Sequence, residues 1–122
     1  MTMSEHNPDA LQFARANAII NRCPQLPIID LDWIRPQLPG RFDYIVASEV
    51  TYNREYCQPL LKLLKTCLKA DGEVILAGEM RKSSMDFYKE LETGFNIRVQ
   101  KKTLRSENDK VSIYLFRMTL KG

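Results

Sequence analysis

A cluster of polar side chains follows the apolar run from Tyr44 to Ala47. Ser48, Glu49, Tyr52 and Asn53 bring together a hydroxyl, a carboxylate, a phenol and an amide. The run has the length of a short buried strand, so these residues stand at a strand's carboxyl end. Ligands bind at that edge in open α/β sheets, which makes this stretch a candidate active site. In a plainer interpretation, Glu49 caps the next helix and Tyr52 packs its ring against it.

Two further carboxylates stand at predicted strand ends. Glu5 ends the run from Thr2 to Glu5, and Asp32 follows the apolar stretch from Ile28 to Leu31. A carboxylate has two oxygens that can accept hydrogen bonds from a ligand's hydroxyls or amines. Each site also has a plainer interpretation. Glu5 can be a surface acid favoured by the helix dipole, and Trp33, beside Asp32, can simply cover the core.

Three helices must position these residues. The first begins at Pro8 after the capping residue Asn7 and runs to about Asn21. The third begins at a capping box of Ser83 and Asp86 and ends before Gly94. The second ends near Lys69, with Asp71 and Gly72 as its stop. It carries an apolar stripe of Leu60, Leu61, Leu64 and Leu68.

The strands predict a mixed sheet. The unbroken run from Val74 to Ala77 is typical of a strand covered on both faces. Apolar residues alternate on either side of the polar turn from Ser106 to Asp109, which predicts an antiparallel hairpin. They are Ile97, Val99, Val111, Ile113 and Leu115. The order β-α-β-β-α-β-α-β-β, with parallel units first and the hairpin last, predicts an α/β fold.

The pattern Glu49-x-x-Tyr52 after a strand resembles the motif of the seven-strand (class I) S-adenosylmethionine-dependent protein methyltransferases, especially the protein-lysine group. The longer string SEVTYN, residues 48–53, is similar to the motif of the related protein-histidine methyltransferases. The predicted elements follow that Rossmann-like fold from its second strand onward. The family's first strand and glycine-rich cofactor loop would lie before Met1, so residues 1–122 are expected to form a single partial methyltransferase domain.

The resemblance implies S-adenosylmethionine as the cofactor, with no metal. It implies that the Glu5 carboxylate accepts hydrogen bonds from the two ribose hydroxyls. It also implies that the Asp32 carboxylate accepts a hydrogen bond from the adenine amine. The residues expected to contact the cofactor are Glu5, Asp32, Trp33 and Ser48.

Glu49 and Tyr52 stand where the resemblance places the methyl acceptor. Methyl transfer from a sulfonium is an in-line displacement, so the enzyme mainly positions a neutral amine or imidazole. Glu49 would orient that nucleophile, and Tyr52 would offer its ring face and hydroxyl to the nascent cation.

Composition narrows the class of protein. Hydrophobic residues make up 44% and charged residues 27% of the 122 residues, as in soluble globular domains. A net charge of +3 is too small to indicate a nucleic-acid partner. Cys23, Cys57 and Cys67 lack C-x-x-C spacing, which favours a reducing compartment and argues against zinc. No membrane span or signal peptide is apparent, so a cytoplasmic or nuclear location is expected.

Two other features receive plain interpretations. His6, the sole histidine, has no partner placed by spacing and is expected to be solvated. Basic residues on the predicted hairpin could attract an acidic substrate, but a charged edge that deters aggregation is the favoured interpretation. They are Arg98, Lys101, Lys102 and Arg105.

We therefore predict an S-adenosylmethionine-dependent N-methyltransferase whose acceptor is a protein lysine. A protein histidine and a small molecule remain alternative acceptors. A third alternative is a non-catalytic fragment that acts only with a partner, since the isolated chain is expected to be inactive. The absence of the family's first strand also predicts self-association through exposed strand edges.

Overall fold

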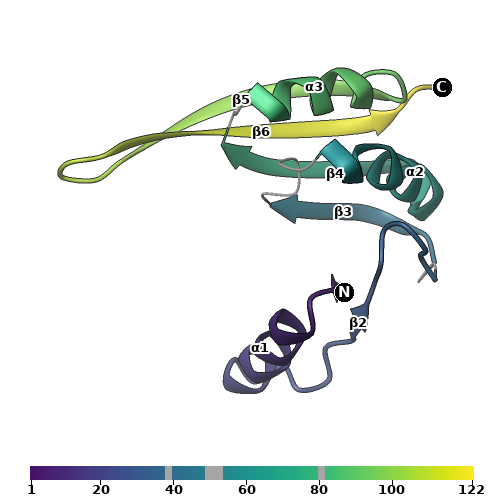
Figure 1. Ribbon diagram of the computed structural model, residues 1–122, viewed down its shortest axis with the longest axis vertical. Coiled ribbons are helices and arrows are strands. Elements are labelled where there is room, and N and C mark those ends of the chain that lie inside the picture. Colours follow the sequence, from purple (N-terminus) through teal and green to yellow (C-terminus); the bar gives the residue numbers. More distant parts are fainter. Residues whose placement is uncertain (38–39, 49–53, 80–81) are drawn as a thin grey trace. The chain divides into compact units, whose positions relative to one another are not determined.

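The computed structural model describes residues 1–37, 40–48, 54–79 and 82–122 (Figure 1). The chain divides into two compact units, Met1–Gln37 and Leu38–Gly122, and the prediction of one domain over the whole chain stays a prediction. The elements of the first unit are β1 (Met3–Glu5), α1 (Pro8–Ile20) and β2 (Ile28–Asp30). Those of the second are β3 (Phe42–Ser48), a 3₁₀ turn (Arg54–Tyr56), α2 (Cys57–Cys67), β4 (Leu68–Glu79), α3 (Lys82–Leu91), β5 (Phe95–Arg105) and β6 (Lys110–Leu120).

The first unit is a parallel pair of short strands with one helix. Met3 of β1 pairs with Ile28 of β2, and Glu5 pairs with Asp30. The predicted helix start is confirmed, because Asn7 Oδ1 accepts hydrogen bonds from two backbone N–H groups of the first turn at 2.9 and 3.1 Å. The buried side chains of this unit are Leu11, Ala18 and Leu31.

The second unit is a four-stranded mixed sheet in the order β3-β4-β6-β5. β3 is parallel to β4, and the other two pairs are antiparallel, which confirms the predicted α/β class and the terminal hairpin. Two backbone hydrogen bonds between Ser106 and Asp109 close the hairpin turn, at 2.8 and 3.3 Å.

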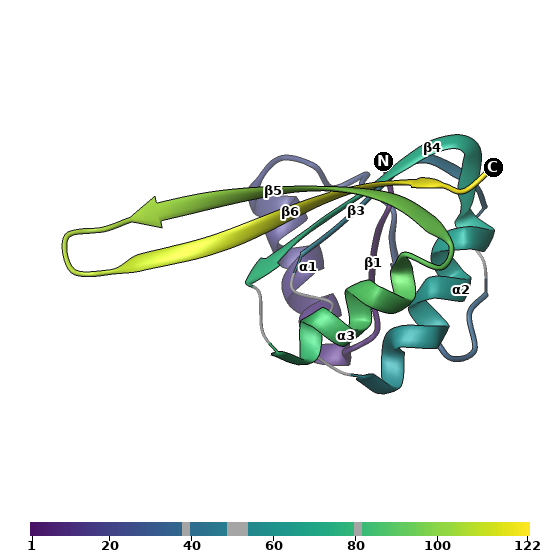
Figure 2. The ribbon, with the colours of Figure 1, turned by 90° about the horizontal axis from the view of Figure 1, so that it is seen from above.

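Both α2 and α3 cover the same face of this sheet (Figures 1 and 2). Cys57 at the start of α2 donates to Glu90 of α3 at 3.4 Å, which ties the two helices together. Tyr88 stacks on Phe116 with ring centroids 3.7 Å apart. The most buried side chains beneath the helices include Val74, Leu76, Phe87, Leu91, Phe95 and Met118.

Among the described residues of the second unit, no helix covers the opposite face of the sheet. Val46 of β3 and Ile75 of β4 are register partners, so their side chains point to this same face. The side chains of Tyr44 and Val46 are 67% and 73% exposed. Val74 and Leu76 are buried on the face beneath α2 and α3, and Ile75 and Ala77 are half-buried on the other, so coverage of this run on both faces stays a prediction.

Two predicted helix boundaries differ from the structure. α2 ends at Cys67, and β4 begins at Leu68, so Asp71 and Gly72 lie inside a strand instead of stopping the helix. The reason is that β4 extends back along β3, where Leu68 pairs with Phe42. α3 begins at Lys82, which places Ser83 within the helix and not at its cap.

Among the described residues, no helix has the length and apolar character needed to cross a bilayer.

Candidate functional site

The carboxyl ends of β1 and β2 gather acidic side chains in the first unit. Glu5 Oε1 accepts hydrogen bonds from the backbone N–H groups of His6 and Asn7, at 3.0 and 3.2 Å. These bonds hold the Glu5 carboxylate beside the start of α1, where the helix dipole favours negative charge. The backbone oxygen of Glu5 accepts from Leu31 N–H at 3.0 Å, which fixes β1 against the chain leaving β2.

Asp32 is held by a local turn. Its Oδ1 accepts from the backbone N–H of Ile34 at 2.9 Å. The side chain is 37% exposed, so a ligand can reach its carboxylate. Trp33 is half-buried beside it in the chain.

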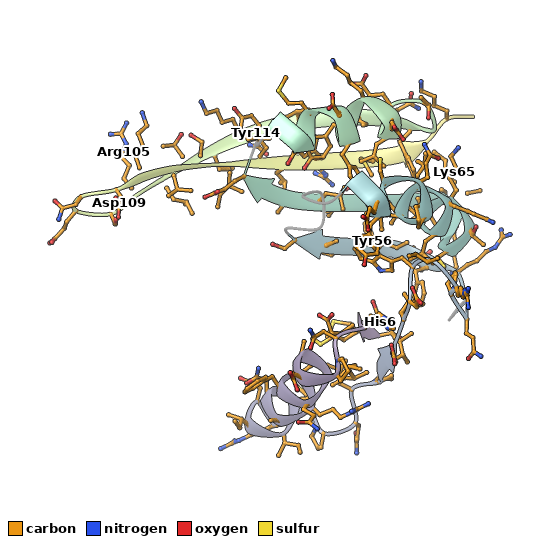
Figure 3. All side chains as sticks on the ribbon, viewed as in Figure 1. His6, Tyr56, Lys65, Arg105, Asp109 and Tyr114 are labelled. Carbon is orange, nitrogen blue, oxygen red and sulfur yellow. The ribbon has the colours of Figure 1, made fainter. Side chains whose placement is uncertain are left out.

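His6 links the two strand ends through carboxylate contacts that spacing along the sequence did not indicate. Its Nδ1 lies 2.8 Å from Asp30 Oδ1, and its Nε2 lies 4.0 Å from Asp32 Oδ2. The hydrogen bond with Asp30 raises the pKa of His6 above its ordinary value; the charges of Asp30, Asp32 and Glu5 act in the same direction and desolvation opposes them. Its side chain is nevertheless 62% exposed, which agrees with the expected solvation. Figure 3 shows His6 at the end of β1.

One signal in the sequence could have found this partner. Parallel strands end at the same edge of a sheet, so the residue after Glu5 must lie near the residues that end β2. The pairing of Glu5 with Asp30 meets that condition.

This edge is rich in hydrogen-bond acceptors. Glu5 and Asp32 stand on neighbouring strand ends, and both carboxylates are anchored by backbone N–H groups. Vicinal hydroxyls and an exocyclic amine are donors that such carboxylates accept well. The two carboxylates therefore offer acceptors to a ligand that carries hydroxyl or amine donors.

The second predicted cluster lies at the end of β3, in the other unit. Ser48 is the last residue of β3; it is exposed and pairs with Ala77 of β4. Glu49 and Tyr52 lie outside the described residues, so their roles stay predictions. The structure brings Glu5 and Asp32 to one edge but does not test whether Ser48 joins them.

Comparison with protein families gives one match over most of the chain. A family described as lysine methyltransferase matches residues 4–94. This range includes Glu5, Asp32 and the stretch from Ser48 to Tyr52. No curated protein matches the chain at a significant level.

Several solved structures share the fold. One is precorrin-6y C5,15-methyltransferase from Geobacter metallireducens, with a TM-score of 0.78 and 14% identity over 97% of this chain and 65% of that one. Another is the N-methyltransferase NodS from Bradyrhizobium japonicum with S-adenosyl-L-homocysteine. Its TM-score is 0.73, with 15% identity over 95% of this chain and 65% of that one. A third is the glycopeptide N-methyltransferase MtfA, also with S-adenosyl-L-homocysteine. Its TM-score is 0.77, with 12% identity over 98% of this chain and 73% of that one.

These matches confirm the predicted Rossmann-like methyltransferase fold. The chain spans 65% of the length of the Geobacter and Bradyrhizobium proteins that it resembles.

Proposed function

Because the chain belongs to the lysine methyltransferase family, we propose that it serves in the N-methylation of a protein lysine side chain. The observation that carries the proposal is the family match over residues 4–94. S-adenosylmethionine supplies the methyl group in methyltransferases of this kind. Two of the similar structures hold its demethylated product, S-adenosyl-L-homocysteine.

Glu5 and Asp32 are the residues that would hold the adenosine part of this cofactor. Glu5 would accept from the ribose hydroxyls, and Asp32 would accept from the adenine amine. Their anchoring by backbone N–H groups supports this assignment, because the carboxylates are oriented before a ligand arrives. Trp33 and Ser48 are further cofactor contacts in this proposal.

Glu49 and Tyr52 would act on the acceptor. A lysine amine attacks only in its neutral form, and the product carries a positive charge. In the proposal, Glu49 orients the amine and Tyr52 stabilises the charge that develops on it.

Two other acceptors have one observation each in their favour. The string SEVTYN at residues 48–53 is similar to the protein-histidine methyltransferases and favours an imidazole acceptor. The similarity of fold to a methyltransferase named for precorrin-6y favours a small molecule.

A role that depends on a partner is supported by the sheets. Among the described residues, β1 pairs only with β2, and β3 pairs only with β4. Transfer requires the donor methyl to be held in line with the acceptor, and we propose that the 122 residues alone do not achieve this.

The test is methyl transfer from S-adenosylmethionine with a labelled methyl group, using the protein expressed from its complete gene and a protein extract as the acceptor. Hydrolysis of the labelled proteins to amino acids then separates methyl-lysine from methyl-histidine. The 122-residue chain is assayed in parallel. Label in methyl-lysine supports the proposal, whereas label confined to methyl-histidine or to small molecules overturns it.

A further inference from the structure

The outer half of the β5–β6 hairpin extends past the rest of its sheet. β5 and β6 pair from Phe95–Leu120 to Arg105–Lys110, whereas β4 accompanies β6 only as far as Ile113. Figures 1 and 2 show the two-stranded ribbon projecting beyond β4. Every residue from Arg98 to Val111 is exposed. Burial therefore does not explain the length of this ribbon, since an isolated two-stranded hairpin is only marginally stable.

The hairpin also concentrates positive charge. Residues 95–120 contain six lysines and arginines against two acids, a net charge of +4 that exceeds the +3 of the whole chain. Arg117 is paired with Glu73 at 2.6 Å. The other five basic residues form no ion pair with any described residue. They are Arg98, Lys101, Lys102, Arg105 and Lys110.

The strand register sorts these cations by face. Residues directly opposite in an antiparallel pair share a face, so Arg105 and Lys110 lie on one side together. Lys101 lies on that side as well, opposite Tyr114. Like charges directly opposite each other are destabilising, so a bound anion would relieve a cost present in the free ribbon. We name this surface the basic face: Lys101, Arg105, Lys110, Ser112 and Tyr114.

A hollow extends along the basic face between Tyr114 and Lys110. It has a volume of about 380 Å³. Its lining residues are Glu79, Lys101, Lys110, Val111, Ser112 and Tyr114. Two ammonium groups and two hydroxyls can donate to a carboxylate there, and Glu79 leaves the lining with a net charge of +1. Figure 3 shows Tyr114 toward the sheet and Arg105 toward the tip.

We propose that the basic face binds an extended acidic segment of a protein partner. Alternate residues of an extended chain recur on one face about every 7 Å, which is also the spacing of Lys101, Thr103 and Arg105 along β5. Acidic side chains at alternate positions of the partner would therefore meet Lys101 and Arg105, with Lys110 beside them.

Two observations favour a protein over a nucleic acid. Successive bases of a single strand stack on several aromatic side chains, whereas the projecting residues 103–112 contain none and the basic face has only that of Tyr114. Glu107 and Asp109 at the turn would repel phosphates.

Protection of a sheet edge does not explain the pattern either, because that role does not require cations and hydroxyls to share one face around a hollow. The inference rests on the proposed function only in taking the acidic segment to belong to the protein that is methylated.

The experiment measures binding of a fluorescent peptide of alternating glutamate and serine to the full 122-residue chain at low ionic strength, by anisotropy. The test variant carries Lys101→Glu, Arg105→Glu and Lys110→Glu. The control carries Lys62→Glu, Lys89→Glu and Lys121→Glu, which makes three lysine-to-glutamate changes at exposed positions elsewhere. Circular dichroism verifies that both variants fold. We expect the test variant to lose about tenfold or more in affinity, since three exposed ion pairs become repulsive, while the control stays within about twofold.

Equal losses in the two variants would overturn the inference, as would wild-type binding no stronger than that of a glutamine-serine peptide. Stronger binding of a single-stranded oligonucleotide would also overturn it, in favour of a nucleic acid. Peptide binding needs no methyl transfer. Charge-dependent binding without transfer would therefore count against the proposed function alone, and transfer without charge-dependent binding would count against this inference alone.

Discussion

Glu5 and Asp32 each place a carboxylate at the end of a strand, and each is anchored by backbone N–H groups. If they hold the adenosine of the cofactor, Asp32→Ala should weaken S-adenosyl-L-homocysteine binding to the protein from the complete gene by about 1–3 kcal/mol, because donors of the ligand lose their acceptor. Isothermal titration calorimetry measures this. Asp109→Ala, at the hairpin turn, is the control and should bind as the wild type does. Unchanged affinity in both Asp32→Ala and Glu5→Ala would remove the assignment.

We expect His6 to make the stability of the first unit depend on pH. Its folded pKa is raised above the ordinary 6.5 by the hydrogen bond with Asp30. Protonated His6 therefore stabilises the folded state. Its contribution to the free energy of unfolding is complete below pH 6.5 and disappears as pH rises through the raised pKa.

We expect unfolding of the first unit, followed by the fluorescence of Trp33, to require less urea as pH rises through this window. Trp33 is the sole tryptophan of the chain, so it reports on this unit. His6→Gln should remove that part of the pH dependence. An identical pH profile in the variant would show that the His6–Asp30 pair contributes nothing.

Glu49 and Tyr52 are predicted to act on the acceptor and not on the cofactor. Glu49→Gln and Tyr52→Phe should then lower kcat on the order of 100-fold through misplacement of the amine, with little change in cofactor affinity. Single-turnover methyl transfer and calorimetry measure the two effects separately. Parental rates in both variants would leave the motif a purely structural role.

At the scale of elements, β3 and β4 approach closely at Gly72. A Cβ atom added there would lie 2.9 Å from the backbone oxygen of Asp43 on β3 and 2.6 Å from Leu68 Cδ1. Gly72→Ala should therefore cost about 1–3 kcal/mol of unfolding free energy, because backbone cannot yield as a flexible side chain does. Urea unfolding followed by circular dichroism checks this. Gly122→Ala, with no atom within 4 Å, is the control and should be neutral.

At the scale of the whole molecule, the four-stranded sheet has two unlike edges. β5 carries Arg98, Lys101, Lys102 and Arg105, whereas β3 contains no lysine or arginine. Charged side chains deter strand pairing, and a flat apolar edge invites it. We therefore propose that the 122-residue chain self-associates through β3, where Val46 is exposed.

The test is Val46→Lys, which should shift the chain toward monomer in size-exclusion chromatography with light scattering. The matched control is Val99→Lys on β5, where Val99 is also exposed and the edge is already charged. The proposal would be contradicted if the unmodified chain, Val46→Lys and Val99→Lys were all monomers. It would also be contradicted if both variants shifted equally toward monomer.

Local signals in the sequence were enough to predict much of this fold. Capping by Asn7 and the alternation on both sides of Ser106–Asp109 act over a few residues, and both were confirmed. The order of strands and helices along the chain predicted parallel units first, and this was confirmed as well. The same local reasoning placed Glu5 and Asp32 near strand ends, where the structure has them.

Tertiary structure decided what depends on pairing between distant segments. The predicted stop of α2 at Asp71 and Gly72 was wrong because β4 reaches back along β3, and this strand pairing involves residues far from the helix in sequence. His6 meets Asp30 across 24 positions of sequence only because the register of β1 and β2 brings them together. The shared face of Arg105 and Lys110 likewise follows from the register of β5 and β6. Composition and spacing specify which side chains are present, but strand register decides which of them meet.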